Sequence, residues 1–418
     1  MGAEVTQSGL DDRLAGLGAP QEGGWLGKAR SDALGRLRAV GLPTRRDEYW
    51  RYTDPRPFTA AEAATFDVHA EPDPFAAIDA FVITLNADGL HWSGDLPEGI
   101  TIDRLSEAGA ADIHWARDVY GTLEAAGSRP VSRPLAMLNS AFASDGVLIH
   151  VVGRVTRPIH LRYALTDGSP LLHHVVKIDA HASVTLLESG ALGARGSTVL
   201  EVDLAEHGIC HHIRIQGRHH DRHLHSHAFA RLAAEATFKS FTLSMNGALT
   251  RNEHVIELTG DDGVAHVAGA AIGRADMHHD DTVFVTHDAV NCESRQVFKK
   301  VLRDGATGVF QGKILVKEGA QKTDGYQISQ SLLLDDDSVF LAKPELEIYA
   351  DDVACSHGST TGAIDETALF YLRSRGVPER EATDLLVLSF LAEAMEEIED
   401  EGLRTHITEL ATDWLRDG

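Results

Sequence analysis

Cysteine is scarce in this sequence. The three that occur, Cys210, Cys292 and Cys355, lie far apart, and none belongs to a CxxC pair. An odd number of scattered cysteines supports neither a disulfide framework nor a zinc or cluster site that the chain completes with its own thiolates. Cys210 and Cys292 are isolated, and an isolated cysteine is most often a small buried apolar residue. The composition therefore fits a reducing compartment.

Basic residues are also few, with 38 Lys and Arg against 63 Asp and Glu, which gives a formal net charge of −25 at pH 7. Nucleic acids and anionic membranes bind cationic surfaces, so this balance argues against both as partners. The sequence has no apolar run long enough to span a bilayer, and its N-terminus has no apolar signal segment. These absences predict a cytoplasmic protein, or a mature chain whose targeting segment is missing.

Catalytic and nucleotide-binding motifs are lacking as well. Residues 305–313 are glycine-rich like a phosphate-binding loop, but only three residues separate Gly308 from Gly312. In addition, Ile314 stands where a Ser or Thr would hold magnesium. No nucleophile elbow, HExxH sequence or dinucleotide fingerprint occurs. We therefore expect that this chain does not itself bind ATP through a P-loop.

The sequence does contain a long series of short β-rich segments, between about residues 146 and 362. Runs such as 174–178, 199–204 and 283–286 are separated by Gly, Asp or Ser turns, and strong helix candidates are almost absent. Many short strands predict a sandwich, a barrel or a solenoid. The runs show no exact period, so periodicity does not choose among these folds.

Helical patterns flank this β-rich core and suggest three domains. Residues 1–135 read as a helical and mixed α/β N-terminal domain, residues 136–363 as the β core, and residues 364–418 as a C-terminal helical domain. Within the first domain, Trp50 and Tyr52 are expected to anchor the chain on the core, since large aromatic side chains usually serve burial.

Acidic residues crowd the C-terminal helical region between Glu393 and Glu401. Two interpretations of this region stay open. The acidic residues form the solvated side of an ordinary helical bundle, or they form a docking surface for a partner.

Cys355 and His357 are the strongest candidate metal ligands. Residues two apart in an extended chain project to the same side, so the thiol and the imidazole would share one face. Two ligands are half of a tetrahedral site, so this chain alone would leave the site incomplete. An uninterrupted strand would place both ligands on the side of Glu345 and Glu347. Alternatively, the preceding Asp pair, residues 351–352, marks a turn that resets the alternation.

A second group of histidines is large but less specific. Its members are His207, His211, His212, His219, His220, His223, His225 and His227. His223, His225 and His227 would line one face of a strand, where they could hold a divalent metal. Polar residues on an outer β face are commoner than metal sites, so the simpler interpretation is an exposed polar surface.

Five short segments near the C-terminal end form a specific combination. They are residues 321–324 (QKTD), 326–327 (YQ), 343–352 (KPELEIYADD), 355–358 (CSHG) and 371–376 (YLRSRG). This combination resembles the SufB and SufD scaffold proteins of iron–sulfur cluster assembly.

Two further features point to SufD within this family. The run of residues 44–53 resembles the N-terminal signature of SufD proteins, which extends the similarity over nearly the whole chain. SufB sequences tend to carry an acidic residue after the histidine that matches His357, whereas SufD sequences carry a glycine, as Gly358 does here.

The resemblance implies a right-handed parallel β-helix with α-helical regions at both ends. It implies a non-catalytic scaffold subunit that pairs with SufB through the β-helix and binds the ATPase SufC through the C-terminal helices. His357, with Cys355 nearby, would share a transient iron–sulfur cluster with SufB. Whether the isolated chain forms a homodimer stays open.

Two alternatives remain. A SufB-type paralogue would carry more of the cluster chemistry, but the residue after His357 and the scarcity of cysteine argue against it. A β-helix enzyme acting on acidic polysaccharide would also stack strands and display Asp residues. Such enzymes are usually exported, and no signal segment is seen here.

Overall fold

The computed structural model describes residues 2–18, 23–69, 71–217, 221–245 and 247–417. Its strands are β1 (Phe81–Asn86), β2 (Gly89–Trp92), β3 (Ile100–Arg104), β4 (Val147–Val151), β5 (Ile159–Leu165), β6 (Leu171–Ile178), β7 (Ser183–Leu192), β8 (Arg195–Leu204), β9 (Ile209–Gln216), β10 (His223–Leu232), β11 (Thr237–Ser244), β12 (Leu249–Leu258), β13 (Val264–Arg274), β14 (His278–His287), β15 (Glu293–Arg303), β16 (Thr307–Val316), β17 (Thr323–Leu333), β18 (Val339–Ile348) and β19 (Val353–Gly362).

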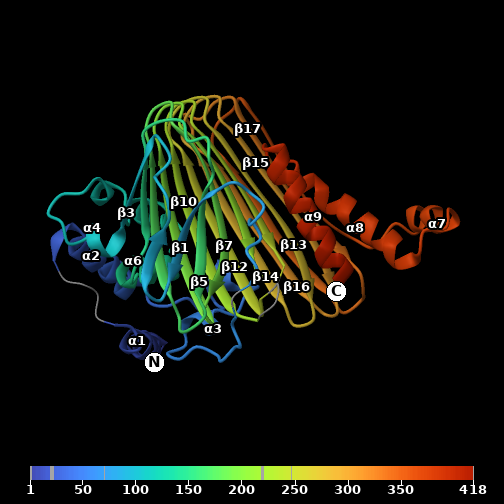
Figure 1. Ribbon diagram of the computed structural model, residues 1–418, viewed down its shortest axis with the longest axis horizontal. Helices are drawn as coiled ribbons and strands as arrows, with labels where there is room; N and C mark the ends of the chain where they lie inside the picture. The colour runs from blue at the N-terminus through green and yellow to red at the C-terminus, as the bar shows by residue number, and fades with distance from the viewer. Residues whose placement is uncertain (1, 19–22, 70, 218–220, 246, 418) are drawn as a thin grey trace.

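These strands form two sheets (Figure 1). One has ten strands in the order β19-β17-β15-β13-β11-β9-β7-β5-β1-β2, and the other nine in the order β18-β16-β14-β12-β10-β8-β6-β4-β3. From β4 onward, successive strands alternate between the sheets and pair in parallel with the strand of the next coil. The chain thus winds as a parallel β-solenoid of about seven turns. The mainly β fold with a parallel β-helix core, predicted from the sequence, is confirmed.

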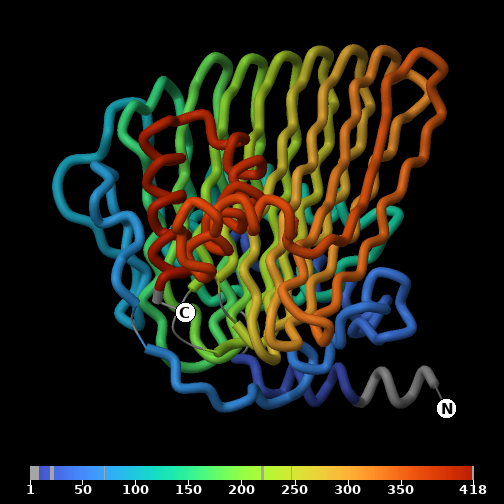
Figure 2. Tube along the Cα trace, turned by 90° about the vertical axis from the view of Figure 1, so that its right-hand side faces the viewer, coloured from blue at the N-terminus to red at the C-terminus, as the bar shows by residue number. Residues whose placement is uncertain are grey.

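The helices and 3-10 turns are α1 (Gly2–Ala15), α2 (Gly24–Val40), η1 (Glu48–Trp50), α3 (Arg56–Thr59), α4 (Leu105–Ala108), η2 (Trp115–Asp118), α5 (Thr122–Gly127), α6 (Pro134–Phe142), α7 (Glu366–Ser374), α8 (Glu379–Met395) and α9 (Glu401–Asp417). Helices α3, α5 and α6 contact the nine-stranded sheet, and α8 contacts β13 and β15 of the ten-stranded sheet. Figure 2 shows α8 and α9 lying across the strands of the ten-stranded sheet. The helical regions therefore cover the outer faces of different sheets.

The first strands belong to the same sheets as the later ones. β1 pairs in parallel with β5, and β3 pairs antiparallel with β4, so residues 81–104 extend the solenoid at its N-terminal end. The three domain ranges given above stay a prediction. Among the described residues, no helix is long and apolar enough to cross a membrane.

One corner of the solenoid repeats a left-handed backbone conformation. The residues with φ of 56–61° at this corner are His181, His207, Glu235, Asp262, Asn291 and Lys322. The backbone N–H of each donates to a carbonyl of the next coil, as from His207 to Ala234 at 3.0 Å. The spacing varies from 26 residues between the first pair to 31 between the last. This variation explains why no exact period is visible in the sequence.

Candidate functional site

The last coil of the solenoid is open at its edge. β18 and β19 are the outermost strands of their sheets, and within the described ranges no strand pairs with their outer sides. Every side chain of β19 is half-buried or exposed, whereas β13 is buried along most of its length. An edge strand presents unpaired N–H and C=O groups, so this end is a template for strand pairing with another chain.

Cys355 and His357 both lie on β19. The half-buried Cys355 packs in a small apolar cluster that includes Leu346. Since residues two apart in a strand project to the same side, His357 is placed on the face of Cys355. This face is the side of Leu346, opposite to Glu345 and Glu347, so the expectation based on an uninterrupted strand is wrong.

The reason is the Asp pair that precedes the motif. Asp351 and Asp352 form the corner between β18 and β19, which belong to different sheets. The alternative prediction of a turn is therefore correct. Glu345 and Glu347 face outward, where Tyr49 Oη donates to Glu345 Oε2 at 2.7 Å and Lys313 pairs with Glu347 at 2.5 Å.

The two side chains supply one sulfur and one nitrogen ligand. Burial raises the pKa of the Cys355 thiol, so the thiol is protonated at neutral pH until a metal ion displaces the proton. His357 is exposed to solvent. The described residues contain two groups of three or more converging metal-ligand side chains, and neither includes Cys355 or His357. A tetrahedral site here would need ligands from outside this chain.

The N-terminal run of residues 44–53 contacts the C-terminal run of residues 343–352, and both runs carry the family resemblance. Tyr49 and Glu345 are 296 residues apart in sequence, and Lys343 Nζ lies 2.6 Å from Glu48 Oε1 and 4.2 Å from the centre of the Tyr49 ring. Trp50 is buried, which agrees with its predicted role as an anchor, and Tyr52 is half-buried. The N-terminal segment therefore braces β18, one of the two open edge strands.

The predicted histidine face on β10 exists, but it is not an exposed polar surface. His225 and His227 are each 1% exposed, because the N-terminal segment covers them. Trp50 and Phe58 lie with ring centres 5.9 and 5.2 Å from that of His225. The partner of these imidazoles is a segment far away in sequence, which local alternation could not reveal. His219 and His220 lie outside the described residues.

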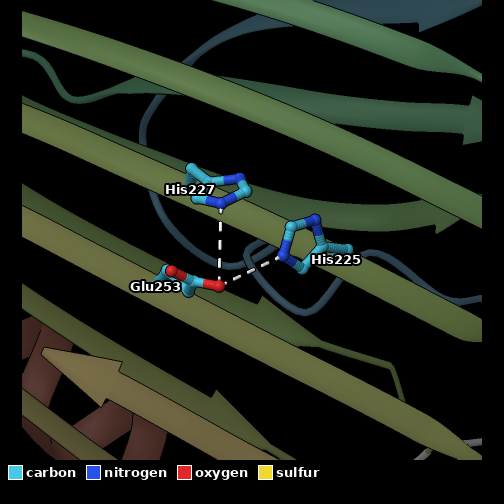
Figure 3. Close-up of side chains that lie close together, drawn as sticks. All are labelled: His225, His227 and Glu253. Atoms are coloured by element: carbon cyan, nitrogen blue, oxygen red, sulfur yellow. Dashed lines mark ion pairs between the residues drawn. The ribbon is translucent and has the colours of Figure 1, made fainter. Parts of the chain in front are cut away.

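His225, His227 and Glu253 converge beneath this cover (Figure 3). The Nε2 atoms of the two histidines lie 3.5 and 3.8 Å from Glu253 Oε1. However, Arg251 Nε donates to the same oxygen at 2.8 Å, and Arg133 Nε lies 3.3 Å from Glu253 Oε2. A cation would compete with two buried guanidinium groups for one carboxylate. This cluster fits an ion-paired anchor for the N-terminal cover better than a metal site.

Charge balance supports this interpretation. Burial alone would raise the pKa of Glu253, but Arg251 and the neighbouring histidines hold it well below its usual range. Burial lowers the pKa of His227 well below its usual range, so its ring is neutral. Glu253 is thus a buried anion that pairs with Arg133 and, together with Asp280, balances Arg251.

The other described histidines of this group lie in different parts of the solenoid. His212 points into the solenoid, where its Nε2 lies 3.2 Å from Glu188 Oε1. His211 points outward, with Nε2 3.1 Å from Glu399 Oε2 in the segment that joins α8 to α9. His207 stands at the corner, 3.2 Å from Glu235. The sequence cluster is therefore not one site in space.

The acidic C-terminal region also has partners that the sequence did not reveal. Across the outer face of the ten-stranded sheet, the strand register places four basic residues in one row: His211, Lys239, His266 and Arg295. Glu397 and Glu399 pair with members of this row, and Glu393 pairs with Lys299. These glutamates fasten the C-terminal helices to the solenoid.

Comparison with known proteins agrees with the fold and the motifs. The family model for the SufBD core domain of the SUF system of FeS cluster assembly matches residues 165–390, more than half of the chain. The iron–sulfur cluster assembly protein SufD of Escherichia coli is 29% identical over 396 residues, which cover 90% of this chain and 89% of that protein.

Two other relatives extend this comparison. A SufBD family protein of Synechocystis (slr0076) is 28% identical over 403 residues, covering 88% of this chain and 86% of that protein. SufD of Bacillus subtilis is 31% identical over 163 residues, which cover 39% of this chain and 37% of that protein. This chain therefore belongs to the SufBD family of iron–sulfur cluster assembly proteins and is SufD-like within it.

Proposed function

We propose that this chain is the SufD-like subunit of a SUF assembly complex, in which it pairs with SufB and binds the ATPase SufC. One observation carries the proposal: Cys355 and His357 occupy an open edge strand and form only part of a ligand set. A second chain that pairs with this edge would bring further ligands next to them.

In this proposal SufB joins the open end by adding strands to β18 and β19. A SufB thiolate and sulfide then complete the coordination that His357 and Cys355 begin. Imidazole is an effective iron ligand but replaces thiolate in only some clusters, and it suits a site from which a cluster is released. The cluster is cargo of the complex, and the isolated chain holds none stably.

SufC binding is assigned to the C-terminal helical domain, residues 364–418. None of the residues of α7 is buried, and its consecutive aromatic residues Phe370 and Tyr371 are 73% and 54% exposed. Exposed aromatic residues in adjacent positions suit a protein interface. ATP-driven association of two SufC subunits would pull on these helices and thereby on the sheet beneath α8.

The proposal makes the chain a scaffold in the cytoplasm and not an enzyme. Its net charge of −25 disfavours nucleic acid and anionic membranes as partners, which leaves proteins as the partners it would bind.

The test is co-expression with SufB and SufC, anaerobic isolation, and visible spectroscopy of the complex. His357→Ala should preserve the complex and abolish most of the cluster absorption. His91→Ala is the matched control, because His91 is exposed on β2, the opposite edge strand of the same sheet. Truncation after Ala363, which removes α7, α8 and α9, should abolish SufC capture and keep SufB pairing. Full cluster assembly by the His357→Ala complex would contradict the site, and unchanged SufC capture would contradict the docking surface.

A further inference from the structure

Two buried arginines line one cavity beside the solenoid. Arg13, in the last turn of α1, is 2% exposed, and Arg195, the first residue of β8, is 5% exposed. The cavity has a volume of about 460 Å³ and lies between the end of α1, residues 61–63, the end of α6 and the turn from β5 to β6. Figure 1 shows α1 and α3 together at one end of the strands. The cavity is therefore formed by segments that are far apart in sequence.

Neither arginine has a counter-charge among the described residues. The Nη1 atom of Arg195 donates to the backbone oxygen of Ala60 at 2.6 Å, and its other contacts are also backbone carbonyls. The described part of the chain offers the Arg13 guanidinium no hydrogen-bond or ion-pair partner. Glu62 lines the cavity but is exposed to solvent and pairs with neither arginine. A buried charge without a partner is costly, so this arrangement calls for an anion.

The electrostatics of the cavity point the same way. Burial and, to a smaller extent, the charge of Arg195 lower the pKa of Arg13 to about 10, which leaves its guanidinium protonated at neutral pH. His223 is paired with Arg195 in the strand register, and burial together with the charge of Arg195 lowers its pKa, so the imidazole is neutral. The cavity thus holds two cations that no described residue neutralises.

The remaining walls indicate the chemistry of an occupant. Leu17, Phe142 and Pro170 provide apolar surface, and Ser144 and Ser169 line the same space. Sites for small molecules usually have volumes of roughly 300–1,000 Å³, largely apolar walls and a few polar groups that fix the orientation. Guanidinium groups match the oxygens of phosphate in geometry. A phosphate monoester carries a charge of about −1.5 to −2 at neutral pH, which balances two arginines.

We propose that this cavity binds a small organic phosphate, whose phosphate group is held by Arg13 and Arg195 while its organic part lies against Leu17 and Phe142. Because Arg13 belongs to α1 and Arg195 to β8, the bound phosphate also joins α1 to the solenoid. The site shares no residue with the open edge at Cys355 and His357. The inference therefore does not depend on the proposed function.

The test is calorimetric titration of the full chain, in buffer free of phosphate, with phenyl phosphate as the probe. One molecule should bind per chain. Arg13→Gln and Arg195→Gln should each weaken binding at least about tenfold, because each removes charge-assisted hydrogen bonds to the phosphate. Arg157→Gln is the matched control, since Arg157 is exposed and already pairs with Asp79 at 2.9 Å. It removes the same charge and should keep the wild-type affinity.

Two further probes separate the possible ligands. Inorganic phosphate lacks an organic part, and benzoate carries a carboxylate in place of the phosphate, so both should bind more weakly than phenyl phosphate. If either bound as tightly as phenyl phosphate, the choice of an organic phosphate would be wrong. No binding to the wild-type chain, or equal binding to Arg13→Gln and Arg157→Gln, would overturn the site itself.

Stability provides an independent readout of the same site. Arg13→Gln leaves no described partner behind, so without ligand it should melt at or above the wild-type temperature. Phenyl phosphate should raise the melting temperature of the wild type and of Arg157→Gln but not that of Arg13→Gln. It should also slow hydrogen exchange at the end of α1 in the wild type alone of the pair with Arg13→Gln. A melting temperature of Arg13→Gln well below that of the wild type would show that Arg13 is already paired within the chain, which contradicts the inference.

Discussion

His266 Nδ1 lies 2.8 Å from Glu397 Oε2, and its other nitrogen lies 3.0 Å from Glu293 Oε1. The first contact joins the outer face of the solenoid to the segment between α8 and α9. The second joins β13 to the neighbouring strand β15. Beside it, Lys239 and His211 both pair with Glu399. The helices proposed to bind SufC are therefore held to the sheet by a compact charged contact as well as by apolar packing.

The first prediction concerns this contact. Glu397→Ala should loosen α8 and α9 by about 1 kcal/mol, because the carboxylate is largely covered but the pair is not fully desolvated. Hydrogen exchange should rise in both helices and stay unchanged in β7–β15. The exposed Glu409 on α9 offers a control, and Glu409→Ala should leave the exchange as in wild type. Equal exchange in both variants would show that apolar packing alone holds the helices.

The second prediction is the pH dependence of the same contact. Burial alone would raise the pKa of both carboxylates. The hydrogen bond from His266 and the nearby basic groups together lower the pKa of Glu397, and Lys239 with the neighbouring histidines lowers the pKa of Glu399. These carboxylates stabilise the contact above their ordinary pKa of 4.5, and the gain is lost as the pH falls below it. Burial lowers the pKa of His211 from 6.5, so the folded state favours the neutral ring. This contribution to stability begins to be lost as the pH falls below 6.5.

Helix docking should therefore weaken from about pH 6.5 downward and more steeply below pH 4.5. Hydrogen exchange corrected for the intrinsic effect of pH measures this directly. His211→Gln should remove the upper part of the transition and keep the lower part. A docking equilibrium that is flat between pH 7 and pH 4 would contradict the assignment.

Much of the fold could be predicted from local sequence, because the strands of a solenoid show the same alternation of inward and outward side chains as any half-buried strand. The runs at residues 174–178, 199–204 and 283–286 all lie in strands, namely β6, β8 and β14. No coil period is visible in the sequence, because the corners between strands differ in length from one coil to the next. The choice of a solenoid over a sandwich or a barrel came from the family resemblance.

The candidate site was predicted in part. The shared face of Cys355 and His357 follows from their spacing alone. Which face it is depends on the corner at residues 351–352, and a sequence with two Asp residues fits either a turn or an exposed strand. The burial of His225 and the pairing of Glu397 depend on segments more than a hundred residues away, so no local pattern could predict them.

The third prediction tests the anchor of the N-terminal cover. Glu253→Gln should destabilise the protein by about 3–5 kcal/mol, since it leaves Arg133 buried beside a neutral group and removes one of the two buried carboxylates that pair with Arg251. A large fall in melting temperature measures this. Asp203→Asn is the control, because Asp203 pairs with Arg231 on the same sheet face in a partly exposed setting and should cost less than about 1 kcal/mol. Similar melting temperatures for the two variants would contradict the anchoring role.

The fourth prediction concerns the three thiols. Cys210 and Cys292 are buried, and burial raises the pKa of Cys210 to about 12, whereas Cys355 is half-buried on an edge strand. Iodoacetamide should therefore label Cys355 first in the native chain, at a rate below that of a free thiol because burial also raises its pKa. Mass spectrometry of the peptides measures each rate, and all three cysteines should react alike in denaturant. Pairing with SufB should protect Cys355 and leave the other two unchanged. Labelling of Cys355 at the same rate in the chain and in the complex would mean that SufB does not cover β19.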